Sequence, residues 1–384
     1  MKNIYIDVTS LTEVDFVTGI QRVVKNVLIE MKKIIPEEMV LIAYSANAEG
    51  FVKINQQVFF DYYSSSSMVD KKRFLTKDKI EFSEMDCTDV FFDIDSVWNS
   101  AFNRSLLYPM LKKYGVKIAV YVYDIIPITE PQFCHEETIF RFLSYAGAFL
   151  QHADIVITST KSTLDEVYKL ANRLGTKRMK GSYSWLGSDF NSCKQDESET
   201  IENKVKQVSE SKYILCVGTI EPRKNHAFLL DVFEEELFEK NINLVFAGKM
   251  GWNVEELAER IKNHKYLNQK LFYFNGLNDA SIAYLYESAL MLAFPTYNEG
   301  FGLPIVESLE RGTPVIASDI PVLREVGKEY CEYFKLNDKR AFADKVMLYS
   351  ENIDIYNKMK NRIREYTSFT WKETAECIIA ALEV

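Results

Sequence analysis

The alternation of short apolar runs with helical patterns is the feature that most limits how this chain can fold. In its second half, runs rich in Val, Ile, Leu and Phe occur at residues 213–217, 243–247, 271–274, 291–294 and 315–317. Between them, apolar positions recur at helical spacing over residues 225–239, 254–264, 280–288 and 303–311. Strands that alternate with helices form a doubly wound parallel sheet, so this half is predicted to be an α/β domain.

The first half repeats the alternation less regularly. Strands are expected at residues 4–8, 41–44, 90–92, 116–122 and 155–158. A helix is expected to start at Thr18 and Gly19, because Thr18 and Gln21 fit a capping box. Residues 1–190 are therefore predicted to form a first α/β domain with a mainly parallel sheet, and residues 212–365 a second.

Between these domains the chain is polar and almost free of large apolar residues over 189–212. This composition predicts a linker at residues 191–211. A surface loop with one helical turn is the alternative.

Composition narrows the class of protein. The net charge of −9 argues against a general nucleic-acid binder. No apolar run approaches the ~20 residues that span a bilayer, and the N-terminus is unlike a signal peptide. The six cysteines are scattered without a C-x-x-C pair, which suits a reducing compartment, so a cytoplasmic protein is expected. Its four histidines make chemistry based on histidine clusters improbable.

The loop G-T-I-E-P-R-K-N, residues 218–225, is predicted to follow a strand and to open a helix with Asn225 at its N-cap. Arg223 and Lys224 would then lie beside the positive end of that helix, where cations are unfavourable. A local loss of helix stability of this kind indicates a function such as anion binding. A solvated loop with a chance basic pair is the alternative.

The stretch Y-N-E-G-F-G-L-P-I-V-E, residues 297–307, is the most informative. Gly300 and Gly302 let backbone amides approach a ligand closely, and the amides at 302–303 open a helix, which favours an anion. Glu299 in the loop and Glu307 one turn into the helix can face the same ligand. A capped core helix with surface glutamates is the alternative.

Four segments of residues 213–327 together resemble a known family. They are Y-I-L-C-V-G-T-I-E-P-R-K-N, G-K-M-G-W, N-E-G-F-G-L-P-I-V-E-S-L and G-T-P-V-I-A-S-D-I-P-V-L-R-E-V-G. In order and spacing they resemble the donor domain of retaining glycosyltransferases of family 4. The resemblance implies the GT-B fold, with two Rossmann-like domains facing across a cleft. The first domain, residues 1–190, would bind the acceptor, and the second would bind a nucleoside diphosphate sugar.

The resemblance also implies roles for individual residues. Lys224 and Arg223 would bind the diphosphate, Glu299 would contact the donor sugar, and Glu307 would accept hydrogen bonds from ribose hydroxyls. Further donor contacts are expected from Gly19, Thr219, Gly276, Leu277, Gly300, Phe301, Gly302 and Leu303. Neither a metal nor an organic cofactor is expected.

The N-terminal half resembles the family more loosely. Thr18-Gly19-Ile20 is similar to its glycine-containing loop, and Tyr123-Asp124-Ile125-Ile126-Pro127 is similar to its H-D-x-x-P turn. Because tyrosine stands where histidine is common, Asp124 is the candidate for a polar contact at the reacting centre. A turn-forming role for Asp124 is the alternative. Residues 366–384 are similar to the tail that crosses back onto the first domain.

Two further patterns admit more than one interpretation. Asp93-Ile-Asp95 matches the D-x-D metal–diphosphate motif of the other main glycosyltransferase architecture, but such pairs are frequent in an acidic chain. Residues 169–180 carry five Lys or Arg. A solvated helix end explains them most simply, and contact with anionic lipid or a lipid-diphosphate acceptor is the other interpretation.

The resemblance implies a retaining glycosyltransferase, and the commonest use of the family suggests bacterial surface polysaccharide synthesis. The enzyme would move a mannose- or rhamnose-like hexose from a nucleoside diphosphate to a hydroxyl of a glycan or lipid-linked glycan. Peripheral contact with the inner membrane surface would follow from a lipid-linked acceptor. A GT-B sugar-nucleotide epimerase and a non-catalytic nucleotide-sugar-binding subunit are the alternatives.

Overall fold

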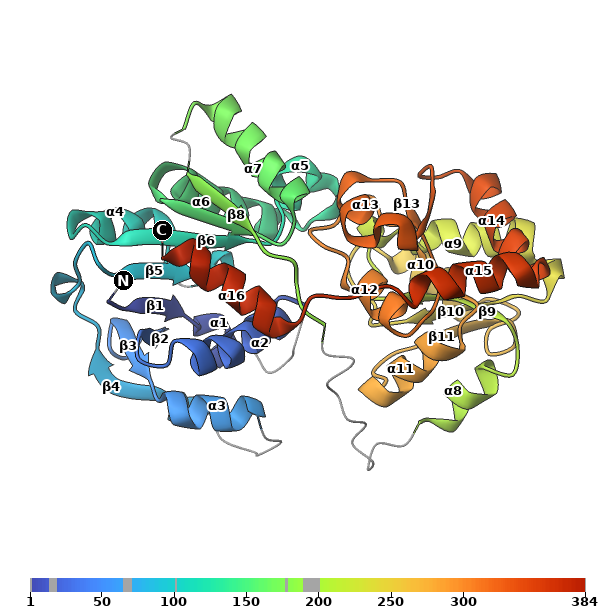
Figure 1. Ribbon diagram of the computed structural model, residues 1–384, viewed down its shortest axis with the longest axis horizontal. Coiled ribbons are helices and arrows are strands. Elements are labelled where there is room, and N and C mark those ends of the chain that lie inside the picture. The colour runs from blue at the N-terminus through green and yellow to red at the C-terminus, as the bar shows by residue number, and fades with distance from the viewer. Residues whose placement is uncertain are drawn as a thin grey trace. The chain divides into compact units, whose positions relative to one another are not determined.

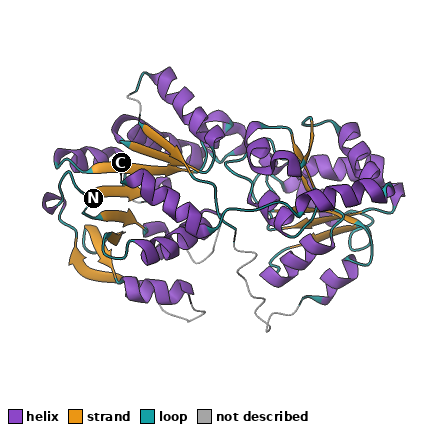
Figure 2. Ribbon diagram, in the orientation of Figure 1, coloured by secondary structure: helices purple, strands orange, loops and turns teal. Residues whose placement is uncertain are grey.

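The computed structural model describes residues 2–13, 19–64, 71–100, 102–176, 179–188 and 201–383. The chain divides into two compact units. Unit 1 comprises Met1–Gly187 and Phe369–Val384, and unit 2 comprises Ser188–Ser368. Both are α/β, as predicted, with helices packed on the faces of a central sheet (Figure 2).

The described part of unit 1 contains a sheet in the order β4-β3-β2-β1-β5-β6-β7-β8. The strands are β1 (Ile4–Asp7), β2 (Met39–Ser45), β3 (Gly50–Ile54), β4 (Leu75–Lys79), β5 (Val90–Asp93), β6 (Lys117–Val122), β7 (Ile155–Thr158) and β8 (Lys180–Tyr183). Neighbours from β2 to β8 pair in parallel, whereas β3 pairs antiparallel with β2 and β4. The sequence analysis missed β3, β4 and β8. Of these, β4 and β8 were missed because they are short, polar and mostly exposed or half-buried.

The helices of unit 1 are α1 (Thr9–Glu13), α2 (Gly19–Ile34), α3 (Gln56–Ser64), α4 (Arg104–Lys113), α5 (Ile126–Thr129), α6 (Glu136–His152), α7 (Lys161–Leu174) and α16 (Trp371–Leu382). The last of these, α16, packs beside α2 (Figure 1). Its N-terminus is closed by a capping box between Thr370 and Glu373. A hydrogen bond of 2.8 Å from Thr374 Oγ1 to the Trp185 carbonyl connects α16 to the segment that follows β8.

In unit 2 the described strands form a wholly parallel sheet in the order β11-β10-β9-β12-β13-β14. The strands are β9 (Tyr213–Val217), β10 (Asn243–Ala247), β11 (Leu271–Phe274), β12 (Met291–Phe294), β13 (Val315–Ser318) and β14 (Glu332–Phe334). All five predicted strands are present, because a central parallel strand is a continuous apolar run.

The helices of unit 2 are α8 (Asn203–Val208), α9 (His226–Val232), α10 (Glu255–Lys262), α11 (Asp279–Ser288), α12 (Leu303–Glu310), α13 (Pro321–Gly327), α14 (Lys339–Glu351) and α15 (Ile353–Ile363). The helix predicted at 225–239 is α-helical only to Val232 and continues as a π turn over Phe233–Leu237. Within the predicted linker, residues 191–200 lie outside the described residues, and α8 occupies part of the remainder.

Each sheet contains one position at which the strand order reverses. In unit 1 the chain builds outward from β1 on one side and from β5 on the other, and β9 and β12 play the same roles in unit 2. The loops that leave the carboxyl ends of such a strand pair diverge to opposite faces and leave a crevice between them. These two crevices are therefore the first places to look for ligand sites.

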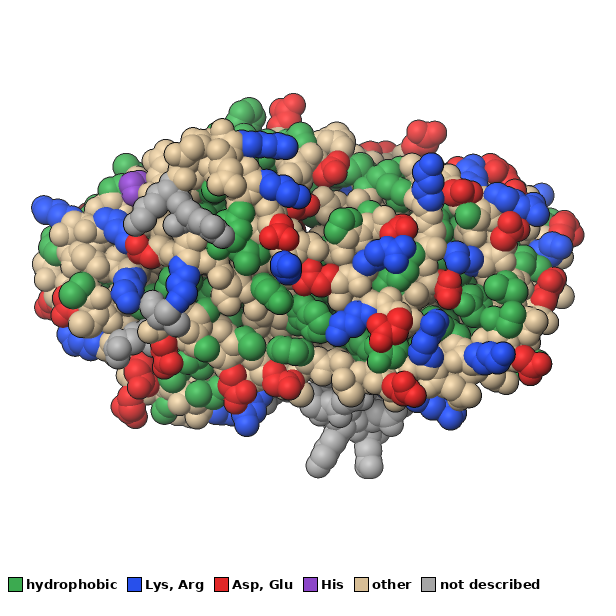
Figure 3. Space-filling model, turned by 45° about the horizontal axis from the view of Figure 1, so that its top comes forward, with side chains coloured by type: hydrophobic (Ala, Val, Ile, Leu, Met, Phe, Trp, Pro, Cys, Tyr) green, Lys and Arg blue, Asp and Glu red, His purple; other side chains and the backbone are tan. Residues whose placement is uncertain are grey.

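The surface carries both charge signs. On the face shown in Figure 3, acidic and basic side chains intermix with hydrophobic ones, so the net charge of −9 does not gather in one patch of that face. In the part of the chain that the structure describes, every helix is too short or too polar to cross a bilayer.

Candidate functional site

A cluster of charged side chains lies in the loops that follow the neighbouring strands β9 and β12. Arg223 and Lys224 belong to a 3-10 turn, Pro222–Lys224, that follows β9, and Glu299 lies in the loop after β12. Arg223 Nη1 lies 2.8 Å from Glu299 Oε1, and Lys224 Nζ contacts the same oxygen. The structure thus brings these three residues together because their strands are neighbours.

A second carboxylate completes this cluster. Glu221 Oε1 lies 2.6 Å from Arg223 Nη2, and the four side chains are only 5–16% exposed. Two cations and two carboxylates therefore neutralise one another where little water reaches them. The sequence analysis did not single out Glu221, although its place two residues before Arg223 in the same loop was a usable signal.

Electrostatics keep the Glu299 carboxylate ionised. Burial on its own would raise the pKa of Glu299, but the charges of Arg223 and Lys224 outweigh burial and lower it to about 2. The Thr296 hydroxyl also donates to Glu299 Oε1 at 3.1 Å. This carboxylate is consequently a fixed negative charge at neutral pH.

Two glycines shape the backbone around the cluster. A Cβ atom on Gly248, in the loop after β10, would lie 1.9 Å from the carbonyl oxygen of Gly218, so only glycine lets the loops after β9 and β10 pack together. Gly302 has φ +103° and stands at the N-cap of α12. Pro304 occupies the first turn of α12, where its missing N–H costs no hydrogen bond.

The second predicted glutamate is held differently. Glu307 lies one turn into α12, is 6% exposed, and accepts a hydrogen bond of 2.8 Å from the Tyr286 hydroxyl of α11. Tyr286 was not predicted as part of the site. Gly276 and Leu277 lie in the loop between β11 and α11, where Gly276 has φ +73°.

Asn225 corrects one prediction. It occupies the N-cap position of α9 but has a left-handed backbone, φ 58°, and its side chain makes no capping hydrogen bond. Its Nδ2 atom instead donates to the Pro295 carbonyl at 3.3 Å and to Asn337 Oδ1 at 3.2 Å. The expected side-chain cap is therefore wrong, because tertiary partners take the amide.

Gly19 and Asp124 belong to unit 1, whereas the other predicted site residues belong to unit 2. Asp124 Oδ1 accepts a hydrogen bond of 3.0 Å from the Ile126 amide, which is the turn-forming geometry. Tyr123 is buried and donates to the Ile94 carbonyl at 2.8 Å. Gly19 is the first residue of α2, and Thr18 lies outside the described residues.

The first aspartate of the D-x-D pattern is part of a buried ion-pair network. Asp93 accepts hydrogen bonds from Arg104 Nε at 2.8 Å and Nη2 at 3.0 Å, and from the Tyr108 hydroxyl at 2.5 Å. Arg104 also contacts Asp7. Asp93 therefore serves as a counter-ion inside unit 1.

The second aspartate of that pattern, Asp95, accepts from the amides of Ser96 at 2.7 Å and Leu11 at 3.1 Å. Burial raises its pKa to about 6, against the opposing effect of the Ser96 amide. Both aspartates thus have structural partners. Among the described residues, no three His, Cys, Asp or Glu side chains are grouped so that they could hold a metal ion.

A buried histidine beside the cluster predicts a pH dependence. Burial, assisted by Lys224, lowers the pKa of His226 from 6.5 to about 3. Between these values the unfolded chain binds a proton that the folded chain does not, so the free energy of unfolding falls as the pH decreases through this window. The slope reaches at most about 1.4 kcal/mol per pH unit.

His226→Phe is expected to remove this pH dependence of the free energy of unfolding, because phenylalanine does not titrate. The fold should tolerate the new ring, since the His226 ring already packs edge-on against Phe246. Unfolding in urea at pH 7, 6 and 5 measures the slope, and His135→Phe, at an exposed position, is the control. An unchanged slope in His226→Phe would contradict the assignment.

Comparison with known proteins shows which families and structures this chain resembles. Residues 197–366 match the family model of the glycosyl transferases group 1. The whole chain has the GT-B fold. It aligns with HepE of Anabaena, solved in complex with UDP and glucose, over 100% of this chain and 99% of that one, with a TM-score of 0.66 and 12% identity.

Two curated relatives have similar sequences. The serotype-specific mannosyltransferase WbdA of Escherichia coli is 28% identical over 393 residues, which cover 100% of this chain and 45% of WbdA. The O-antigen chain mannosyltransferase RfbU of Salmonella typhimurium is 25% identical over 246 residues, 64% of each chain. The chain thus spans about half the length of WbdA.

Proposed function

We propose that this chain is a retaining glycosyltransferase that moves mannose, or a similar hexose, from a nucleoside diphosphate to a hydroxyl of a glycan. The observation that carries the proposal is the buried cluster of Arg223, Lys224 and Glu299 beside the N-terminus of α12. The match of residues 197–366 to the model of the glycosyl transferases group 1 supports the transfer of a sugar. The names of WbdA and RfbU support mannose and a polysaccharide acceptor.

The proposed chemistry requires that charge developing on the leaving diphosphate be stabilised. Lys224 has three donors and Arg223 has five, so each can contact Glu299 and a phosphate oxygen together. The amides at 302–303 open α12 and add N–H donors with the favourable end of the helix dipole. These groups are fixed before the reaction begins, so little reorganisation opposes the stabilisation they provide.

On the same proposal, Glu299 contacts the donor sugar, and Thr219, Gly276, Leu277, Gly300 and Phe301 line the nucleotide. Gly19 and Asp124 would contribute from unit 1. The incoming hydroxyl would attack the anomeric carbon from the face that the diphosphate leaves and would lose its proton to that diphosphate. Because attack and departure share one face, the sugar would keep its anomeric configuration. The step balances, because the bond from the anomeric carbon to the phosphate oxygen breaks as the bond to the acceptor oxygen forms.

The direct test is release of nucleoside diphosphate from a panel of nucleoside diphosphate hexoses, with and without a manno-oligosaccharide acceptor. Release that depends on acceptor supports transfer. An isomerised sugar formed from donor alone would instead identify an epimerase, and binding without turnover would identify a non-catalytic subunit.

Glu307→Ala is expected to weaken binding of the nucleoside diphosphate about 10- to 100-fold. The physical reason is the loss of a buried carboxylate proposed to accept hydrogen bonds from the ribose, each worth ~1.5–3 kcal/mol. Isothermal titration with the diphosphate measures the change. Glu256→Ala, at an exposed position of α10, is the matched control.

Tyr286→Phe tests whether Glu307 contacts the ribose directly or only positions α11, because this substitution removes only the hydroxyl that donates to Glu307. A loss of affinity equal to that of Glu307→Ala would assign Glu307 a positioning role for α11. No loss in either variant would contradict the proposed ribose contact.

A lipid-linked acceptor and contact with the inner face of the membrane are further parts of the proposal. They rest on the basic stretch at 169–180, of which Lys169 and Arg173 are exposed on α7, while Lys177 and Arg178 lie outside the described residues. Sedimentation with anionic and neutral vesicles tests this contact, and equal binding to both would contradict it.

A further inference from the structure

The chain passes between the two units at two crossings, the first between residues 187 and 188 and the second between residues 368 and 369. On the unit 2 side each crossing begins with a serine, and both serine hydroxyls donate to one carboxylate. Ser188 Oγ contacts Glu310 Oε2, and Ser368 Oγ contacts Glu310 Oε1. A single side chain of unit 2 therefore binds the chain where it enters this unit and where it leaves.

The place of Glu310 in its own helix is unfavourable. Glu310 is the last residue of α12, and the C-terminal end of a helix carries partial negative charge, which favours a basic residue and disfavours a carboxylate. A local loss of helix stability of this kind indicates a role outside the helix. Glu310 is half-buried, so its hydrogen bonds with the two serines are charge-assisted where water competes less.

The same helix opens the proposed donor site. The amides at 302–303 stand at the start of α12, Glu307 lies one turn into it, and Glu310 ends it. Eight residues of α-helix extend over about 12 Å. Because a short helix moves as one rigid element, the position of its first turn and the position of Glu310 are linked.

The two crossings also pack against each other on the unit 1 side. The rings of Trp185 and Phe369 meet edge-on, with centroids 5.8 Å apart. A Cβ atom on Gly187 would lie 2.4 Å from the backbone nitrogen of Trp371, so only glycine lets these two segments approach so closely. Each crossing is thus held by packing within unit 1 and by Glu310 within unit 2, which leaves few rotatable bonds between the two attachments.

We propose that Glu310 is a positioning residue that fastens both crossings to the helix of the proposed donor site. A carboxylate bound to both crossings ties the path of the chain, where it enters and leaves unit 2, to the position of α12. The effect on sugar transfer rests on the proposed function, in which Gly19 and Asp124 contribute from unit 1. Glu310 acts through Ser188 and Ser368 and not by contact with the donor.

Glu310→Ala is expected to lower kcat for sugar transfer about 10- to 100-fold, because misplacement far from the reacting atoms is costly. The Kd of the nucleoside diphosphate should change less than about twofold, since the unit 2 groups proposed to bind it are retained. Glu310→Gln can accept from one serine and donate to the other, so it should keep most of the rate. Glu351→Ala, at the exposed last residue of α14, is the matched control.

A second variant removes the donors and keeps the carboxylate. Ser188→Ala/Ser368→Ala is expected to reproduce the loss of kcat, and adding Glu310→Ala should lower the rate no more than about twofold further, because the three side chains act together. Thermal unfolding shows that each variant is folded. A normal rate in a folded Glu310→Ala variant, or a loss of diphosphate affinity as large as the loss of rate, would overturn the proposal.

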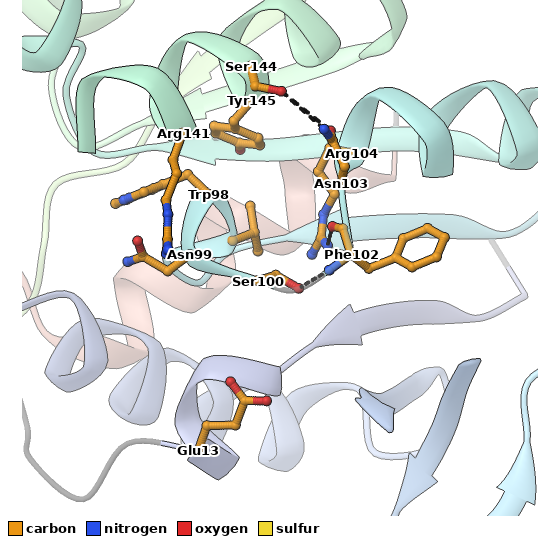
Figure 4. A pocket seen from close by; sticks show the side chains of 11 residues that line it. Glu13, Trp98, Asn99, Ser100, Phe102, Asn103, Arg104, Arg141, Ser144 and Tyr145 are labelled. Carbon is orange, nitrogen blue, oxygen red and sulfur yellow. Dashed lines mark hydrogen bonds between the residues drawn. The ribbon is translucent and has the colours of Figure 1, made fainter. Parts of the chain in front are cut away.

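Fluorine NMR of protein that contains 5-fluorotryptophan tests the crossings without any transfer. Trp185 and Trp371 lie next to the crossings, whereas Trp98 lines a cavity of unit 1 and is the internal reference (Figure 4). Glu310→Ala is expected to shift and broaden the signals of Trp185 and Trp371 and to leave the signal of Trp98 unchanged.

Unchanged signals of Trp185 and Trp371 in the Glu310→Ala variant would overturn the proposal even where transfer is lost. The fluorine result also separates this inference from the proposed function. If the unsubstituted protein transfers no sugar from any donor, the proposed function fails, and the signals of Trp185 and Trp371 still decide whether Glu310 holds the crossings.

Discussion

Lys224→Ala is expected to lower the rate of sugar transfer about 10²- to 10³-fold. The loss follows because a preorganised donor, aimed at charge that develops in the transition state, typically contributes ~2.7–4 kcal/mol. Lys224 contacts Glu299 from a turn that also contains Arg223, so the remaining cation still pairs with Glu299 at 2.8 Å and the fold should persist. Single-turnover measurement of transfer at saturating donor isolates the effect on the chemical step.

The control for this prediction is Lys358→Ala, which removes an exposed lysine of α15 from the same unit. Transfer by this variant should match the unsubstituted protein. If a folded Lys224→Ala variant also transfers at the normal rate, the diphosphate does not bind at this cluster and the donor site must be sought elsewhere.

Asp93→Ala is expected to destabilise unit 1 by about 3–5 kcal/mol. The substitution removes one of two carboxylates that contact the buried Arg104, and it removes the carboxylate that accepts from the Tyr108 hydroxyl. A buried charge left without a full set of partners costs this much because the interior solvates it poorly. Urea unfolding, with hydrogen exchange of the β1 and β5 amides to report on unit 1, measures the change.

Asp78→Ala is the matched control, because Asp78 lies exposed in β4 of the same unit and its loss should change stability by no more than ~0.5 kcal/mol. Asp93→Asn, which retains an acceptor oxygen, should fall between the two. A value for Asp93→Ala close to that of Asp78→Ala would mean that the Arg104 network adds little to stability, as some buried ion pairs do.

The parallel strands that are continuous apolar runs were predictable, and β9, β10, β11 and β12 begin and end where the sequence analysis placed them. The parallel edge strands β8 and β14 were not predicted. The polar edge strand β4 was not, because nothing in L-T-K-D-K distinguishes a strand from a loop until β3 supplies a partner. The predicted side-chain cap at Asn225 was wrong for a related reason. Capping propensity is a local property, whereas Pro295 and Asn337 are brought to Asn225 by the tertiary structure.

Sequence alone determined the α/β class and the motifs around Arg223, Lys224 and Glu299, because periodicity and loop chemistry are local properties of the chain. Three pairings were decided only by the tertiary structure. Glu221 pairs with Arg223 in the charge cluster, the Tyr286 hydroxyl donates to Glu307, and Asp93 is a counter-ion of Arg104. These pairings depend on which strands become neighbours, and strand order is fixed by burial of the whole sheet between its helices.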